Sequence, residues 1–278
     1  MSPHTTKNGN TTVTALLAFE LSMRNRKVCL THVKTKSNAL FSYFNINCEE
    51  DKTANPIQIS NLIKEGGLRK NDISDYCKSL TENLELFSLN CNELEQNSFI
   101  DVMEFISTSF PHDYTVFDID NNDLGTEECK TILRHCDCII FVLSQNSTEF
   151  ESFKENKRIY MHWMKLIPHI VVVNQYNGIV GTLDDVACGI GLKKANKWIK
   201  ISDNPYLAWG TSHNKLLTIF KFMQNRDHRL VDVDSDIKNL VNSIMKVKQA
   251  KRAQKYEEFE KTKSTNPNSD KESNNGVA

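Results

Sequence analysis

The sequence predicts an α/β protein with a mostly parallel sheet and helices on both faces of that sheet. Short apolar runs alternate along the chain with segments of helical length, the order that parallel strands and their crossover helices produce. The runs contain few polar residues, as is typical of strands buried on both faces. The chain has 278 residues, which is long enough to bury a sizeable core without a disulfide or a metal ion.

In the first half of the chain, apolar residues at helical spacing predict a helix over 11–26. Arg24 and Arg26 stand at its end, where cations suit the helix dipole. An apolar strand is expected directly after it, over 28–33. The elements expected next are a short helix or turn at 37–44, short helical segments at 57–63 and 73–80, a strand at 84–89, a helix at 99–110 and a strand at 114–120.

The second half continues the alternation and then changes character. We expect a helix at 126–135, a strand at 138–143, a long helix at 150–166, strands at 170–174 and 198–201, and helices at 214–224 and 235–256. After about residue 248 the sequence is charged and polar, so the last helix is expected to fray into a disordered tail from about residue 261. The predicted organisation is a folded domain over 1–248 and a charged helix end with its tail over 249–278.

Composition argues against several classes of protein. The chain carries 34 Lys and Arg against 35 Asp and Glu, which argues against a nucleic-acid binder that uses its whole surface. No apolar stretch has the length of a membrane span, and the polar N-terminus does not resemble a signal peptide. The eight cysteines then read as reduced thiols of a cytoplasmic protein. Cys136 and Cys138 lack a second ligand pair at zinc spacing, which favours a structural role over a metal site.

The segment before the first helix contains parts of a phosphate-binding loop. Such a loop needs glycines for close backbone approach, a lysine against the phosphate charge, and a Ser or Thr hydroxyl for magnesium. Gly9 and Thr11 stand where the last glycine and the metal hydroxyl belong, and Asn10 stands in the place of the lysine. A Thr at the start of a helix is also a common cap, so the motif alone does not decide between the two roles.

The order of elements resembles that of the ParA/MinD family of deviant-Walker P-loop ATPases, which position plasmids, division sites, pili and other cargoes. The resemblance spans residues 2 to about 245 and rests on a loop, a helix, and the later strands KVCLTHVKT, YTVFDID and IVVVN. It implies a Rossmann-like P-loop NTPase fold. The segment ENLELFSLN is similar to a strand of the TadZ/CpaE branch, which localises pili.

The resemblance implies site residues position by position. Magnesium would be held by Thr11 and by Asp118, which matches the Walker B aspartate. Thr5 replaces the signature lysine that crosses the dimer, and Asn10 replaces the lysine that contacts phosphate. The nucleotide, if it is still bound, would meet Lys7, Gly9, Asn10, Thr11, Thr12 and Asn174, the last from the adenine-contacting position.

The same comparison implies weak or absent hydrolysis. His32 and Lys34 fall where the family places its switch I aspartates, one of which activates the attacking water. Phosphoryl transfer depends on positioned charge, so the loss of both lysines and of this aspartate should remove most turnover. Lys7 or Lys34 could substitute for the missing lysines, and this alternative stays open.

The function expected from the resemblance is that of a positioning or scaffold protein with a degenerate nucleotide site. It would recruit or localise a pilus, secretion, conjugation or plasmid assembly through a protein partner, as a homodimer. ATP and Mg²⁺ are the cofactors implied if the site is retained. The alternatives are a working ATPase of plasmid or chromosome partition, and a DNA-binding regulator. The basic C-terminal helix would serve the regulator, or contact an anionic membrane.

The N-terminus departs from the family. Its members have a buried strand just before the loop, and this chain offers only three or four residues there. Two explanations are open: the recorded start lies downstream of the true one, or the sheet lacks its central strand. A missing central strand would leave backbone groups unpaired on both of its neighbours.

Overall fold

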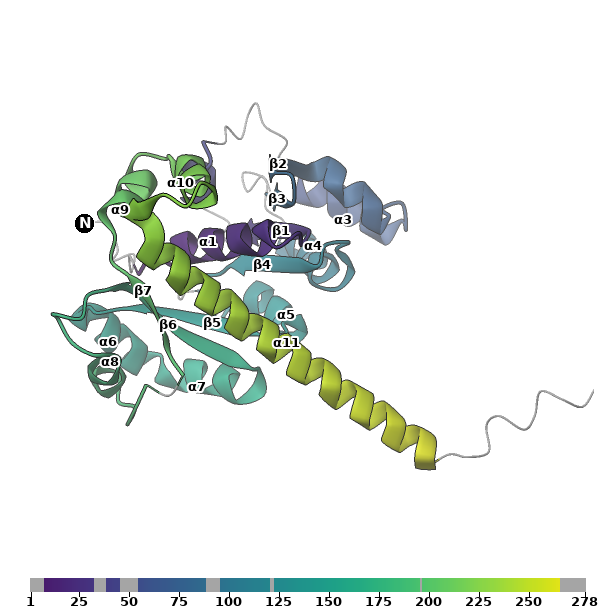
Figure 1. Cartoon of the computed structure of the whole chain (residues 1–278). Helices are drawn as coiled ribbons and strands as arrows, with labels where there is room; N and C mark the ends of the chain where they lie inside the picture. The colour runs from purple at the N-terminus through teal and green to yellow at the C-terminus, as the bar shows by residue number, and fades with distance from the viewer. Residues whose placement is uncertain are drawn as a thin grey trace, which may run out of the picture.

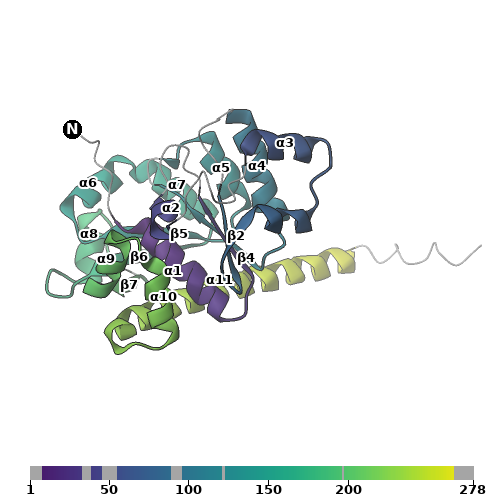
Figure 2. The same cartoon turned by 90° about the horizontal axis from the view of Figure 1, so that it is seen from above.

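A computed structural model describes residues 8–32, 39–45, 55–88, 96–120, 123–195 and 197–265. Strands form the middle of the molecule and helices flank them, as Figures 1 and 2 show from two directions. Most strand pairs are parallel. The predicted α/β class with helices on both faces is therefore confirmed.

The first sheet has the order β2-β3-β1-β4. β1 (Val28–His32) pairs in parallel with β3 (Leu84–Phe87) and with β4 (Tyr114–Asp118). β2 (Cys77–Thr81) pairs with β3 in antiparallel orientation, so the two form a hairpin. The helix expected at 73–80 is wrong, because the 3₁₀ helix η1 (Lys70–Tyr76) ends where β2 begins. The hydrogen bonds between β2 and β3 outweighed the weak helical periodicity of residues 73–80.

The second sheet holds three parallel strands in the order β5-β6-β7. These are β5 (Ile139–Ser144), β6 (His169–Tyr176) and β7 (Ile199–Ser202). They lie where the sequence predicted strands. Among the described residues no strand joins β4 to β5, so the two sheets are separate hydrogen-bonded units. In the part of the chain that is described, the sheet does lack a central strand.

Helices on one face enclose the largest core cluster. It contains most of α1 (Asn10–Met23), together with residues of α10 (Leu216–Gln224) and α11 (Val231–Thr265). The short helices α2 (Ala39–Tyr43) and α9 (Pro205–Ser212) add residues to the same cluster. α11 continues beyond the body of the molecule as a projecting rod (Figure 1). No helix within the described ranges is both long and apolar enough to cross a membrane.

The opposite face is covered by the remaining helices, over two further core clusters. They are α3 (Pro56–Lys64), α4 (Gln96–Ser109), α5 (Glu127–His135), α6 (Ser147–Glu155), α7 (Lys157–Leu166) and α8 (Leu183–Gly189). The single helix expected over 150–166 is wrong. Asn156 interrupts it, and the break lets the rings of Phe153 and Tyr160 stack 4.7 Å apart.

The last helix is longer than expected at both ends. It begins at Val231, because Asp232 and Asp234 in its first turn suit the helix dipole. It reaches Thr265, past the expected end at 256 and past residue 261, where a disordered tail was expected. Lys, Glu, Gln and Ala are frequent after residue 245, and these residues favour helix. The boundary at residue 248 lies inside this helix, and the division into two domains stays a prediction.

Candidate functional site

The N-terminus of α1 lies at the carboxyl ends of β4, β5 and β6. The Asn8 side chain donates from Nδ2 to the Val142 carbonyl of β5, over 2.9 Å. Asn174, near the end of β6, donates from Nδ2 to the Asn8 carbonyl, also over 2.9 Å. These two amides fix the loop that enters α1 against the second sheet. In open parallel sheets, this edge is where ligands bind.

Asp118 anchors the same loop to the first sheet. Its Oδ2 accepts a hydrogen bond from the Thr11 hydroxyl, and its Oδ1 accepts one from Asn10 Nδ2, each over 2.8 Å. Asn10 Nδ2 also donates to the Ile119 carbonyl over 2.8 Å. Asp118 is buried, and both of its oxygens are used by the loop. The structure thus brings together the predicted residues Asn10, Thr11 and Asp118.

Gly9 is required by the geometry of this loop. Its φ is +75°, in the left-handed region that favours glycine. A Cβ at this position would lie 2.2 Å from Asn174 Nδ2, the atom that holds the Asn8 carbonyl. Gly9 and Asn174, predicted from separate segments, are therefore in direct contact.

Glu149 is a buried acid beside the loop that the sequence analysis did not identify. It lies in the first turn of α6 and is 5% exposed. Burial raises the pKa of its carboxyl group. Hydrogen bonds from the Ser144 backbone and from the Asn8 side chain lower this pKa, but their effect is smaller than that of burial. Its Oε1 atom has no hydrogen-bond partner among the described residues. No spacing in the sequence points to Glu149, because only the fold brings α6 next to Asn8.

The other predicted residues fall at or outside the edge of this cluster. Thr12 is buried in α1, and none of the hydrogen bonds above involves its side chain. His32 is buried at the carboxyl end of β1, in register with Asp118. Lys7 and Lys34 lie outside the described residues, so their proposed substitution for the missing lysines is not addressed.

The cluster fits a magnesium ion better than it fits phosphate. A threonine hydroxyl and a carboxylate are the hard oxygen ligands that Mg²⁺ prefers, and those of Thr11 and Asp118 lie in contact. Phosphate requires positive charge or free donors. Asn10 is neutral, and its Nδ2 already donates to Asp118 and Ile119. None of the hydrogen bonds described in this loop is donated by a lysine or an arginine.

Comparison of the whole fold places the chain among known structures. A ParA family ATPase from Chlorobium tepidum TLS superposes with a TM-score of 0.63 at 16% identity, over 83% of this chain and 91% of that one. The chain has the MinD/ParA fold. The MinC:MinD cell division protein complex of Aquifex aeolicus gives a TM-score of 0.60 at 15% identity, over 86% of this chain and 91% of the other.

The MinD/ParA fold also includes structures that contain nucleotide. The septum site-determining protein MinD of Pyrococcus horikoshii OT3, complexed with Mg-ADP, gives a TM-score of 0.58 at 13% identity. That match covers 86% of this chain and 91% of the other. No protein-family model and no curated protein sequence matches the chain. The resemblance drawn from element order is confirmed at the level of the fold.

Proposed function

We propose that this chain is a positioning or scaffold protein of the MinD/ParA fold that does not hydrolyse ATP efficiently. The observation that carries the proposal is the side chain of Asn10. It stands where the resemblance implies the phosphate lysine, and it is hydrogen-bonded to Asp118 and to the Ile119 carbonyl. A neutral amide that is already bonded within the loop cannot stabilise the charge that develops during phosphoryl transfer.

The magnesium side of the site supports retained but weak nucleotide binding. Thr11 and Asp118 would hold Mg²⁺ through the hydroxyl and one carboxylate oxygen, and a bound Mg²⁺ would neutralise part of the phosphate charge. Asn174, held against Asn8, would lie on the adenine side. A protein of the same fold has been seen with Mg-ADP, which supports ATP and Mg²⁺ as the ligands to test.

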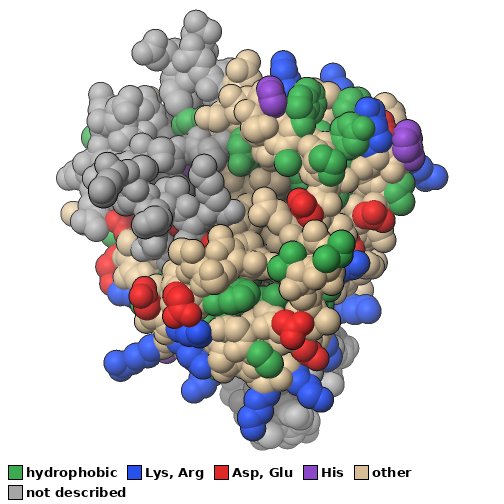
Figure 3. Space-filling model, turned by 90° about the vertical axis from the view of Figure 1, so that its left-hand side faces the viewer, with side chains coloured by type: hydrophobic (Ala, Val, Ile, Leu, Met, Phe, Trp, Pro, Cys, Tyr) green, Lys and Arg blue, Asp and Glu red, His purple; other side chains and the backbone are tan. Residues whose placement is uncertain are grey.

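Exposed apolar side chains on the same end of the molecule support a protein partner. Ile179 and Val180, in the loop that follows β6, are 95% and 68% exposed. Figure 3 shows apolar side chains in several groups on the side of the molecule that it faces. A MinD of similar fold forms a complex with MinC. We therefore extend the proposal to a cytoplasmic homodimer that recruits a protein assembly.

Calorimetric titration with Mg-ATP, together with a phosphate-release assay, tests this proposal. We expect no turnover above background, and binding no tighter than about 0.1 mM, because Asn10 is neutral where the resemblance implies a lysine. The variant Asn10→Lys should bind more tightly, since it restores the charge. Asn10→Ala is the matched control, because it removes the same hydrogen bonds without adding charge.

Two outcomes would overturn the proposal. Micromolar binding with steady turnover by the unaltered chain would indicate a working partition ATPase. Salt-dependent DNA binding that is lost when residues 249–278 are removed would indicate a DNA-binding regulator. Cooperative thermal unfolding of every variant shows that a negative result does not come from misfolding.

A further inference from the structure

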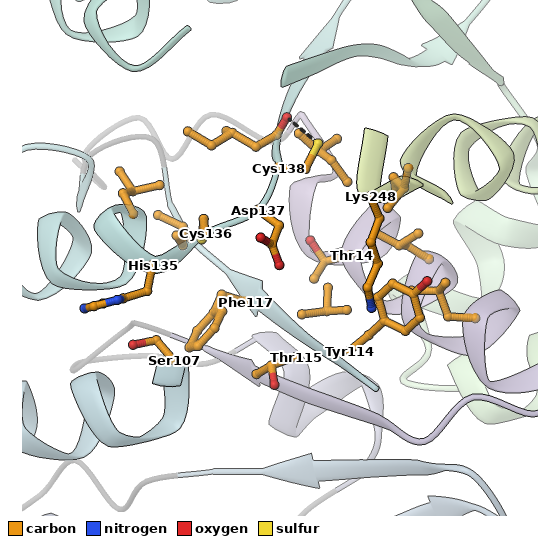
Figure 4. A pocket seen from close by; sticks show the side chains of 18 of the residues that line it. Thr14, Ser107, Tyr114, Thr115, Phe117, His135, Cys136, Asp137, Cys138 and Lys248 are labelled. Atoms are coloured by element: carbon orange, nitrogen blue, oxygen red, sulfur yellow. Dashed lines mark hydrogen bonds between the residues drawn. The ribbon is translucent and has the colours of Figure 1, made fainter. Parts of the chain in front are cut away.

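Pockets in the described part of the molecule differ in the charges that they leave free. One of about 340 Å³ lies between β4 and β5, where Thr14, Phe117 and Lys248 line it (Figure 4). The ammonium group of Lys248 is already in use there. It donates to the Asp113 carbonyl over 3.0 Å and lies 3.8 Å from the centre of the Tyr114 ring. In a second, smaller pocket, one cation has no such contacts.

This smaller pocket, of about 230 Å³, opens where α1, α10 and α11 meet. Figure 2 shows these three helices close together. The apolar part of the lining consists of Phe19 and Met223, which are buried, and of Met23, which is 43% exposed. Pockets for drug-sized ligands measure roughly 300–1,000 Å³, so this one suits a single large side chain.

The methionines indicate what kind of side chain the pocket takes. Met23 ends α1, and Met223 lies in the last turn of α10. The flexible thioether of methionine adapts to the shape of its neighbours, and methionine is frequent on surfaces that bind protein segments. The lining therefore fits a bulky apolar side chain without requiring one exact shape.

Charged side chains surround this lining, and most of them are paired with one another. Glu20 forms an ion pair with Arg24 over 3.0 Å, and Asp234 forms one with Lys238. The remaining charged residue is Arg226, which has no ion pair and no side-chain hydrogen bond to any described residue. The rim of the pocket thus carries one uncompensated positive charge.

The backbone of Arg226 adds a second observation. The residue follows α10 with a φ of +55°, and its N–H donates to the Met223 carbonyl over 3.0 Å. Glycine or asparagine usually takes this left-handed conformation after a helix, because a larger side chain is less favourable there. The turn itself does not require an arginine, which points to a role for the guanidinium group.

The free charge and the pocket together define a complementary ligand. A guanidinium group binds a carboxylate through two parallel hydrogen bonds, so the ligand carries an acidic group next to its apolar side chain. Binding to an anionic membrane uses a cluster of several cations. One free cation beside a recess for one side chain favours a segment of a protein.

We propose that the pocket between α1, α10 and α11 binds a segment of a partner protein in which a bulky apolar residue lies next to an aspartate or glutamate. The apolar side chain enters between Phe19, Met23 and Met223, and the carboxylate pairs with Arg226. This docking site deepens the proposed function and rests on it, since a positioning protein needs a partner.

NMR of the full chain, labelled with ¹³C at its methionine methyl groups, tests the proposal. The probe is the peptide acetyl-Ser-Asp-Asp-Phe-Asp-Asp-Ser-amide. We expect the Met23 and Met223 signals to shift with a Kd of about 0.1–1 mM, as for one anchoring side chain. The signals of Met103 and Met164, which lie outside the pocket, should not move. No shift of the Met23 signal at about 2 mM peptide would overturn the proposal.

Charge reversal tests the role of Arg226. Arg226→Glu should weaken binding of the acidic peptide about fivefold or more, and should favour a matched peptide with lysines in place of the aspartates. Lys221→Glu is the matched control, because Lys221 is an exposed cation of α10 that does not line the pocket. Equal affinities of the unaltered chain for the two peptides would contradict the proposal.

A second variant guards against misfolding. Arg226→Gly suits the left-handed backbone, so it should fold at least as well as the unaltered chain and still lose the preference for the acidic peptide. A preference that survives in Arg226→Gly would overturn the assignment of the charge to this residue.

The remaining outcomes identify other occupants. A Met23 signal that moves with protein concentration, without peptide, would show that a second copy of the chain fills the pocket. A shift caused by anionic phospholipid vesicles but not by the peptide would indicate a membrane contact. Either result would overturn the proposal. Mg-ATP is omitted throughout, so a failure of peptide binding is distinguishable from a failure of the expectations on nucleotide binding and hydrolysis.

Discussion

Gly9 is restricted by its backbone conformation and by a neighbouring side chain. Its φ of +75° disfavours any residue with a Cβ, and Asn174 Nδ2 leaves no space for that atom. Gly66 is the informative comparison. Its φ is +67°, but nothing lies within 4 Å of the place that a Cβ would take. A comparison of substitutions at Gly9 and Gly66 therefore distinguishes the cost of backbone strain from the cost of a steric conflict with Asn174.

We expect Gly9→Ala to lower the free energy of unfolding by about 2–4 kcal/mol, and Gly66→Ala by about 1 kcal/mol. Denaturant unfolding at 25 °C measures both. Adding Asn174→Ala to the Gly9→Ala variant should recover part of the loss, because it removes the side chain that the new methyl group meets. Equal losses at Gly9 and Gly66 would show that contact with Asn174 is unimportant.

Glu149 makes stability depend on pH. Burial raises the pKa of its carboxyl group in the folded protein above its usual value of 4.5, so the native state binds a proton that the unfolded state has released. Stability is therefore lost as the pH rises from about 4.5 through the folded-state pKa, and the loss is complete at higher pH. The uncharged side chain of glutamine avoids this penalty.

The variant Glu149→Gln should raise the free energy of unfolding at pH 7 by about 1 kcal/mol, and by less at pH 4.5. Urea unfolding at the two pH values measures the difference. Glu155→Gln, at an exposed position one residue before the helix break, is the control and should change little. A gain for Glu149→Gln that is the same at both pH values would contradict a titration of this group.

At the scale of elements, α1 is buried on nearly all sides. Residues 12–22 are all buried, because the helix lies between the sheets on one side and α10 and α11 on the other. Stacking of Phe19 on Phe220, with ring centroids 4.2 Å apart, fixes α10 on this helix. The helix that begins at the candidate site is therefore held by packing along most of its length.

We expect Phe220→Ala to lower the free energy of unfolding by about 3–5 kcal/mol, since it leaves a cavity against α1. Trp209→Ala removes a larger side chain from α9 that is 42% exposed, and should cost about 1 kcal/mol or less. Thermal or denaturant unfolding compares the two. A similar loss of unfolding free energy for both variants would mean that the packing of α10 on α1 does not stabilise the fold.

At the scale of the whole molecule, much of the fold follows from local sequence. Apolar runs with sharp boundaries predicted β1, β4, β5, β6 and β7, and the helical spacing of apolar residues predicted α1 and α4. The hairpin strand β2 and the break at Asn156 were not predicted, because each depends on strand pairing or on side-chain stacking between neighbouring elements. Local periodicity does not encode such contacts.

Only part of the candidate site was predictable, because some of its contacts join segments that are far apart in the sequence. Gly9, Thr11 and Asp118 stand at recognisable places in the order of elements, and the structure brings Thr11 and Asp118 into contact. The hydrogen bonds of Asn10 to Asp118 and Ile119 could not be predicted. Neither could the burial of Glu149 beside Asn8, because α6 reaches the loop only through the fold.

The sequence by itself determined the α/β class and the order of most elements. These properties depend on hydrophobic patterns and on residue types within short windows. Only the tertiary structure decided that the described strands form two separate hydrogen-bonded sheets, and that Asn10 bonds to Asp118. These pairings join residues that are far apart in the sequence, 108 positions for Asn10 and Asp118, and only the fold brings such residues together.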